Sequence, residues 1–172
     1  DEAEAVKSSV WRGSLLDRPE LEIADVIRTG AGVRVRVSGR YARPDAPGQF
    51  VQGEYQLTIT PRGVINVGYD FAVTNGLGEV LEAGVSLVLP EGEQTLRWVG
   101  DGPYPGYPGK DLLNDFGLFA VSFDDLHFQG NRRGVEVALM AGGSGRGLAL
   151  LGTKMDVAVE RSGTGVILSH NV

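Results

Sequence analysis

The sequence contains no cysteine and very little histidine. None of the 172 residues is cysteine, which excludes disulfide bonds, thiol catalysis and cysteine-based zinc sites. The two histidines, His127 and His170, are too few for a His-rich metal site. Neither accompanies a Gly-x-Ser-x-Gly motif, so the sequence does not predict a Ser–His–Asp triad.

Long apolar runs and an excess of positive charge are absent as well. No hydrophobic segment approaches the roughly 20 residues that a membrane span requires, and no basic region followed by an apolar segment marks a signal peptide. The formal net charge is −6, which makes nucleic acid a poor partner. We therefore expect neither nucleic acid nor a membrane as a partner. We favour a secreted or periplasmic location over a cytoplasmic one, with any signal removed or outside this segment.

Glycine, by contrast, is abundant, and its 26 residues separate short segments of alternating polarity. Val33, Val35 and Val37 alternate with arginines, and the same alternation recurs at 55–59, 65–73, 135–139 and 155–159. A period of two is typical of β-strands that place one face on a core.

Turn signals lie between these segments. Thr60-Pro61-Arg62-Gly63 predicts a tight hairpin, Asn75-Gly76 predicts a second turn, and 142–145 predicts a flexible hairpin tip. We expect ten to twelve strands and little helix. The pattern predicts an all-β fold, an antiparallel two-sheet β-sandwich over residues 10–172, after an N-terminal tail or linker at 1–9.

Acidic side chains are frequent in the second half of the chain, in turn-like segments: Asp101, Asp111, Asp115, Asp124 and Asp125. A glycosidase needs two carboxylates that face each other across a sugar. Aspartate is common in turns for local hydrogen bonding, and we favour that interpretation, so we assign no catalytic residue. Asp124 and Asp125, with Asp101, could ligate calcium, but no calcium-loop spacing is present. We predict no cofactor, with calcium as the alternative.

Residues 98–110 form a segment crowded with Gly, Pro and aromatic side chains. Aromatic rings can stack on the apolar faces of sugars, while nearby polar groups bind the hydroxyls. In the alternative interpretation Trp98 belongs to the core and the tyrosines clamp the loop. The candidate carbohydrate-binding residues are Trp98, Asp101, Tyr104, Tyr107, Lys110, Asn131 and Arg132.

This segment also carries a family resemblance. Trp98-Val-Gly-Asp-Gly-Pro-Tyr-Pro-Gly-Tyr-Pro-Gly-Lys110 resembles Trp-x-Gly-x-Gly-Pro-x-Glu-x-Tyr-x-Asp-Arg in the C-terminal β-sandwich, or small-chain domain, of glycoside hydrolase family 2 β-galactosidases. Further landmarks follow in the family's order: Val10-Trp11-Arg12, the hairpin at 55–67, Gly117-Leu118-Phe119, Gly130-Asn131-Arg132 and Gly145-Arg146-Gly147-Leu148.

The resemblance implies a galactose-mutarotase-like supersandwich. It also implies a non-catalytic module of a larger carbohydrate-active enzyme, with a galactoside or polysaccharide and the neighbouring catalytic domain as partners. The family's catalytic glutamates lie in a separate barrel domain, so none is carried over. Pro105 stands where the family has Glu, and Gly109-Lys110 where it has Asp-Arg, so the charged contacts of those positions are lost or altered. The chain ends at Val172, before the family's last strands.

Two alternatives remain open at this point. The first is a stand-alone mutarotase-like sugar-processing enzyme, which needs a histidine and a carboxylate in one pocket. The second is a structural interaction module that packs against a neighbouring domain through strand edges or its acidic surface. We expect the chain alone not to be catalytic and its parent protein to be a glycoside hydrolase.

Overall fold

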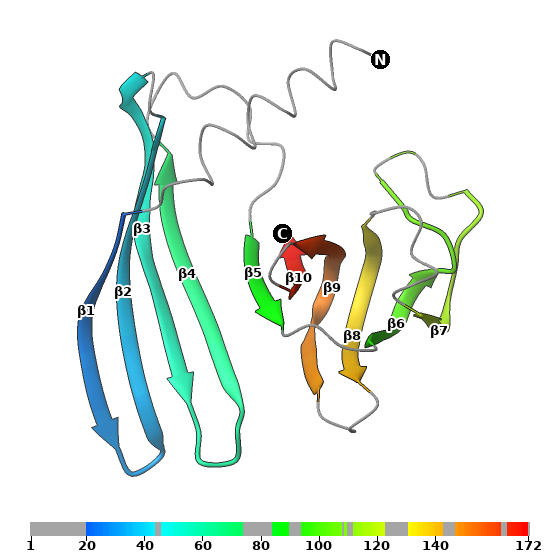
Figure 1. The fold of residues 1–172 in the computed structure, drawn as a ribbon, viewed down its shortest axis with the longest axis horizontal. Coiled ribbons are helices and arrows are strands. Elements are labelled where there is room, and N and C mark those ends of the chain that lie inside the picture. The colour runs from blue at the N-terminus through cyan, green and yellow to red at the C-terminus, as the bar shows by residue number, and fades with distance from the viewer. Residues whose placement is uncertain are drawn as a thin grey trace. The chain divides into compact units, whose positions relative to one another are not determined.

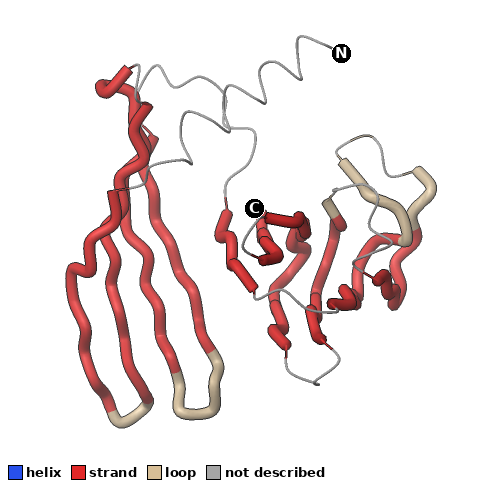
Figure 2. Tube along the Cα trace, in the orientation of Figure 1, coloured by secondary structure: helices blue, strands red, loops and turns tan. Residues whose placement is uncertain are grey.

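The computed structural model describes residues 20–43, 46–73, 84–89, 94–107, 109, 112–122, 131–142, 147–162 and 165–171, and these contain β-strands and no helix (Figures 1 and 2). The strands are β1 (Glu20–Thr29), β2 (Gly32–Arg43), β3 (Ala46–Ile59), β4 (Ile65–Val73), β5 (Gly84–Leu89), β6 (Gln94–Gly102), β7 (Asp115–Ser122), β8 (Arg132–Gly142), β9 (Gly147–Ser162) and β10 (Gly165–Asn171). One sheet has four strands in the order β1-β2-β3-β4, and the other has six in the order β5-β10-β9-β8-β6-β7. Every pairing is antiparallel. The prediction of an all-β fold with two antiparallel sheets is confirmed.

The chain divides into two compact units, residues 1–81 and residues 82–172. We call them the N-terminal unit, which holds the four-stranded sheet, and the C-terminal unit, which holds the six-stranded sheet. The predicted tail at 1–9 and the predicted turn at 75–76 lie outside the described residues, as does most of the tip at 142–145.

Consecutive hairpins build the N-terminal unit, and the predicted turn at Thr60–Gly63 is confirmed. The Gly63 N–H donates to the Thr60 carbonyl at 3.0 Å, and the Thr60 N–H donates to the Val64 carbonyl at 2.9 Å. Gly63 has a φ of 80°, in the left-handed region that glycine adopts without a steric penalty. This turn fixes the β3–β4 register, in which Ile59 pairs with Ile65.

That register gives the four-stranded sheet one apolar and one polar face. Val35 pairs with Leu57, and Leu57 pairs with Val67, so the three side chains share a face across β2, β3 and β4. The intervening residues form the other face, where Arg36 approaches Glu54 at 3.9 Å. Exposed ion pairs of this kind contribute little, about 0–1 kcal/mol. The polar face therefore adds little to the stability of the sheet, and its side chains are available for polar contacts.

Aromatic side chains cluster on the apolar face near the middle of the sheet. The Phe71 ring lies 4.8 Å from the Tyr55 ring and 5.7 Å from the Tyr41 ring, centroid to centroid. The Tyr41 and Tyr55 hydroxyl oxygens are 2.7 Å apart and share a hydrogen bond. Burial, followed by that hydrogen bond, raises the pKa of Tyr55 above its ordinary value.

The C-terminal unit contains the buried core of the described structure: Leu96, Trp98, Val135, Ala138, Met140, Met155, Val157 and Val159. These residues come from β6, β8 and β9, which are adjacent in the sheet. Cross-strand pairs such as Trp98 with Ala138 and Leu96 with Met140 place large and small side chains on one face. This core supports the start and the end of the aromatic loop predicted from the sequence.

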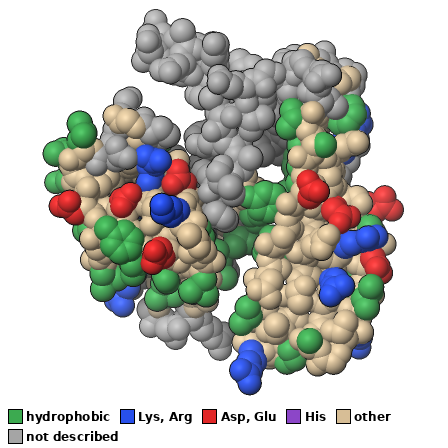
Figure 3. Space-filling model, turned by 180° about the vertical axis from the view of Figure 1, so that it is seen from behind, with side chains coloured by type: hydrophobic (Ala, Val, Ile, Leu, Met, Phe, Trp, Pro, Cys, Tyr) green, Lys and Arg blue, Asp and Glu red, His purple; other side chains and the backbone are tan. Residues whose placement is uncertain are grey.

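Charge on the surface is mixed. On the face shown in Figure 3, acidic and basic side chains are intermingled, with hydrophobic side chains among them. The described part of the chain includes no helix that is long and apolar enough to cross a membrane.

Candidate functional site in the β6–β7 loop

The loop between β6 and β7 is anchored at its start by Trp98. Its ring is only 2% exposed and packs against the Phe119 ring at a centroid distance of 5.4 Å. The Trp98 Nε1–H donates to the Asp101 carbonyl at 2.9 Å, which satisfies the only polar atom of the buried side chain. The indole thus holds the backbone where β6 ends, and neither of its faces is free for a sugar ring.

Gly102 is needed at this place because the chain passes close to Phe119. A Cβ atom at Gly102 would lie 2.6 Å from Cδ2 of the Phe119 ring. The peptide bond from Gly102 to Pro103 is cis. The Gly-x-Gly-Pro frame of the sequence therefore serves a fixed path of the backbone.

Asn114 holds the middle of the loop. Its Oδ1 accepts a hydrogen bond from the Tyr104 N–H at 2.9 Å, and its Nδ2 donates to the Tyr104 carbonyl at 3.0 Å. Both backbone polar groups of Tyr104 are thus satisfied by one side chain, while the tyrosine itself stays 58% exposed. Asn114 was not among the residues selected from the sequence, and its position just before β7 is the only signal for it.

The far end of the loop is tied to the start of β8. The Gly106 N–H donates to the Asn131 carbonyl at 2.8 Å. The guanidinium carbon of Arg132 lies 5.1 Å from the centre of the Trp98 ring, a cation–π geometry. Burial lowers the pKa of Arg132, and the nearby Tyr107 partly opposes this shift. An arginine remains protonated in either case, so the site carries a buried positive charge.

Asp101 contributes the carboxylate of the site. It lies against Gly134, where a Cβ atom would be 2.9 Å from the Asp101 Oδ2 atom. Gly134 belongs to an irregular stretch of β8, where the register with β9 shifts between Arg132 and Val135. Because Gly134 has no Cβ atom, the Asp101 carboxylate can lie directly against the strand there.

The structure thus gathers most of the predicted residues in one region. Trp98, Asp101, Tyr104 and Tyr107 belong to β6 or to the loop, and Asn131 and Arg132 lie where β8 begins. Of these, Trp98, Asn131 and Arg132 are buried, Asp101 and Tyr107 are half-buried, and Tyr104 is exposed. Lys110 lies outside the described residues. A ligand from solvent can therefore meet Tyr104, Tyr107 and Asp101, while the buried members shape the loop.

The described part of this region holds no pair of carboxylates that face each other, as acid–base catalysis would require. Asp101 is opposite Phe116 and Asp115 is opposite Gly102 in the β6–β7 ladder, so the two aspartates are on opposite faces of the sheet. Asp111, Asp124, Asp125 and His127 lie outside the described residues. His170 is on β10, paired with Val157 of β9.

Metal binding has no candidate either within the residues described, where no three His, Asp or Glu side chains gather. The calcium alternative depended on Asp124 and Asp125 as well as Asp101, and the first two belong to the segment at 123–130 that the structure leaves undescribed.

A second surface of the C-terminal unit was not foreseen. On the face opposite Trp98, one row of side chains crosses four strands: Leu118 of β7 pairs with Val99 of β6, which pairs with Val137 of β8, which pairs with Leu151 of β9. Leu118 is 78% exposed and Leu151 is 76% exposed. The apolar run Leu148-Ala149-Leu150-Leu151 carried a signal for it, since strands that are apolar on both faces usually have both faces covered.

Comparison with known proteins assigns the family. The sequence model for the β-galactosidase small chain matches residues 3–161. The chain belongs to the β-galactosidase small-chain family. It is 25% identical to a β-galactosidase of Vibrio cholerae over 119 residues, which are 68% of this chain and 11% of that protein.

Two further members show the same partial coverage. A β-galactosidase of Psychromonas ingrahamii is 25% identical over 78 residues, which are 45% of this chain and 8% of that protein. One of Pectobacterium atrosepticum is 28% identical over 78 residues, again 45% of this chain and 8% of that protein. The part of this chain that matches thus corresponds to about a tenth of the length of each of these curated relatives.

Proposed function

We propose that this chain is a non-catalytic module of a β-galactosidase-like glycoside hydrolase, which supports the catalytic part and contacts carbohydrate through the β6–β7 loop. The observation that carries the proposal is the loop itself: one side chain, Asn114, holds both backbone groups of Tyr104 and leaves that tyrosine exposed. A preorganised aromatic residue loses little entropy when a sugar stacks on it. We also propose the finer fold that the resemblance implies, a galactose-mutarotase-like supersandwich.

The contacts that we propose are few. Tyr104 stacks on the apolar face of a galactoside, and Asp101 and Tyr107 hydrogen-bond its hydroxyl groups. Arg132 keeps its charge under the Trp98 ring and acts as a support for the loop. The expected affinity is low, since one exposed stacking contact and two hydrogen bonds carry it.

The exposed apolar row favours the supporting role. A continuous row of Leu118, Val99, Val137 and Leu151 is the kind of surface that a second domain covers. Because the relatives are about ten times longer than the matched segment, the occupant that we propose is the catalytic part of such a chain. Charge is sparse in this row, which suits a permanent contact.

The test combines activity and binding measurements on the 172-residue chain. We expect no hydrolysis of a chromogenic galactoside, no acceleration of galactose mutarotation, and weak saturable binding of galactosides that Tyr104→Ala reduces. Hydrolysis or mutarotation by the chain alone would contradict the non-catalytic role. If no galactoside or polysaccharide binds, the carbohydrate contact is wrong and the supporting role remains.

The supporting role has its own measurement. Leu118→Ser and Leu151→Ser change the row without touching the buried core, so we expect the double variant to stay folded and to associate less with the catalytic part of such a chain than the wild type does. The matched control is Leu112→Ser, at a position that is exposed in the loop and not part of the row. Unchanged association in the double variant would argue against a docking surface.

A further inference from the structure

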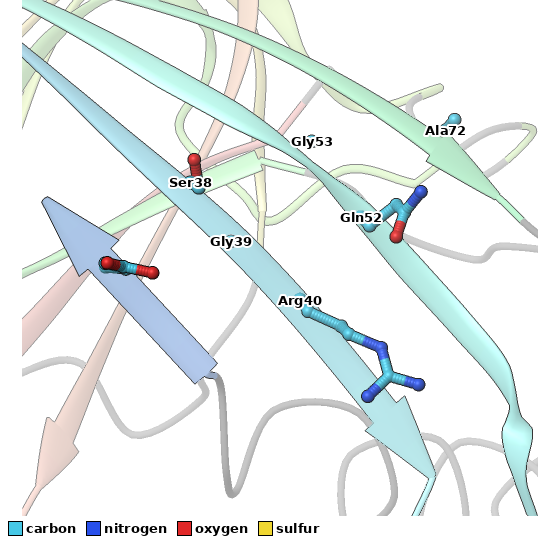
Figure 4. Close-up of a pocket in the computed structure, with 7 residues that line it drawn as sticks. Ser38, Gly39, Arg40, Gln52, Gly53 and Ala72 are labelled. Carbon is cyan, nitrogen blue, oxygen red and sulfur yellow. The ribbon is translucent and has the colours of Figure 1, made fainter. Parts of the chain in front are cut away.

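A shallow depression lies on the polar face of the N-terminal unit, well away in sequence from the β6–β7 loop (Figure 4). Its volume is about 640 Å³, and its lining includes Glu22 of β1, Ser38 and Arg40 of β2, Gln52 of β3 and Ala72 of β4. We call it the polar trough. Its size falls in the range of about 300–1,000 Å³ that is usual for ligand sites.

The strand register brings these side chains together. Glu22 is directly opposite Ser38 in the β1–β2 ladder, and Arg40 is directly opposite Gln52 in the β2–β3 ladder. Gln52 is in turn opposite Ala72 of β4. Directly opposed residues have Cβ atoms about 4.5–5.5 Å apart, so the trough is formed by two neighbouring rows of one sheet face. Figure 4 shows Arg40 and Gln52 extending from adjacent strands, with the small Ala72 beyond Gln52.

The chemistry of the lining suits hydroxyl groups. Arg40 supplies only donors, Glu22 supplies only acceptors, and Ser38 and Gln52 supply both. A sugar hydroxyl both donates and accepts, so each of these side chains can pair with one. Arg40 also lies over the Phe50 ring, with its Cζ atom 4.5 Å from the ring centre, and this contact holds the guanidinium in place.

Other ligand classes fit the polar trough less well. Glu22 offsets the charge of Arg40, and the row that holds Glu22 and Ser38 continues into Glu54 and Asp70. Arg36 lies 3.9 Å from Glu54 and offsets its charge, which leaves the carboxylate of Asp70 in excess, so an anion meets net repulsion. A peptide strand binds at the edge of a sheet, where backbone groups are unpaired, whereas Gln52 lies on β3, which is paired on both sides. Ala72 is the one apolar side chain of the lining, too little for a lipid.

We propose that the polar trough binds a neutral oligosaccharide lying along the face of the four-stranded sheet. The depression is open to solvent along its length, which suits a segment of a chain better than an enclosed monosaccharide. This site goes beyond the proposed function, because it lies in the N-terminal unit and shares no residue with the β6–β7 loop.

The test is an NMR titration of the whole chain with linear galactan and glucan tetrasaccharides. We expect the backbone amides of Gly39 and Gly53, which form the floor of the trough, to shift with saturation. Gln52→Ala should raise the Kd about threefold to tenfold, which corresponds to the loss of one hydrogen bond. Arg40→Ala should have an effect at least as large.

The chain offers matched controls on the same strands and the same face. Gln56→Ala lies about 13 Å along β3 from Gln52, and Arg34→Ala lies about 20 Å along β2 from Arg40. Both should leave the Kd within about twofold, and circular dichroism verifies that all four variants are folded. Equal weakening by the controls would overturn the proposal.

Three further outcomes would also overturn it: no shift of the trough amides with either tetrasaccharide, tighter binding of inorganic phosphate, or tighter binding of an extended peptide. Tyr104→Ala separates this site from the loop. It should leave the shifts at Gly39 and Gly53 unchanged, whether or not the loop binds galactosides.

Discussion

Asn114→Ala tests the organisation of the β6–β7 loop most directly. The variant removes the hydrogen bond from the Tyr104 N–H at 2.9 Å and the hydrogen bond to the Tyr104 carbonyl at 3.0 Å. Each such bond contributes about 0.5–1.5 kcal/mol net, and Asn114 is only half-buried, so we expect a local loss of about 1–2 kcal/mol. Water can replace part of what is lost, which argues for the lower end.

Native-state hydrogen exchange measures this loss at the atom concerned. The Tyr104 amide should exchange about fivefold to tenfold faster in the variant, since about 1.4 kcal/mol corresponds to a factor of ten. The Gly63 amide, bonded to Thr60 in the other unit, should exchange at an unchanged rate. If the Tyr104 amide is equally protected in the variant, the two hydrogen bonds of the Asn114 side chain are not what holds the loop.

Asn114→Asp sharpens the same experiment. The carboxylate keeps an acceptor for the Tyr104 N–H but places a negative oxygen where Nδ2 donates to the Tyr104 carbonyl at 3.0 Å. The Tyr104 amide should therefore be less protected at neutral pH than in the wild type. Protection should recover below the carboxyl pKa, about 4, where the protonated acid can donate again.

The remaining predictions concern the core, the tyrosine cluster and the loop frame. Met140→Ala should cost about 2–5 kcal/mol in urea unfolding, because the side chain is fully buried. Tyr41→Phe removes a hydrogen bond that raises the pKa of Tyr55, so in ultraviolet titration Tyr55 should ionise at a lower pH than in the wild type. Since folding raises the pKa of Tyr55, its contribution to stability is present below about pH 10 and declines at higher pH, and in the variant the decline should end at a lower pH and be smaller in total. Gly102→Ala should lower the melting temperature through the clash with Phe119, and Phe119→Leu in the same chain should recover part of the loss.

Strand positions could be read from the sequence where alternation is strict and a turn signal follows. Val33, Val35 and Val37 lie on one face of β2, and the hairpin after Ile59 turns at Gly63, as expected. Local rules suffice there because period-two patterning and turn chemistry act within a few residues. The faces of the C-terminal strands are harder to predict from the sequence, because β9 carries apolar residues on both faces.

Burial at the candidate site could not be read in the same way. Trp98 is a residue type that often stacks on sugars, yet its side chain is in the core, and the exposed aromatic side chain of the loop is that of Tyr104. The role of Asn114 could not be predicted from the sequence, because it depends on the Tyr104 backbone, ten residues earlier in the chain. The polar trough was equally hidden, since Glu22, Arg40 and Gln52 are separated in sequence and meet only through strand pairing.

The sequence by itself determined the β class, the alternation of faces, the turn at Thr60–Gly63 and, through ordered landmarks, the family. These depend on short-range patterns that each segment carries on its own. Only the tertiary structure decided which side chains of the aromatic loop meet solvent and which residues of separate strands line the polar trough. Register and packing set those outcomes, because a side chain's neighbours across a sheet come from distant parts of the chain.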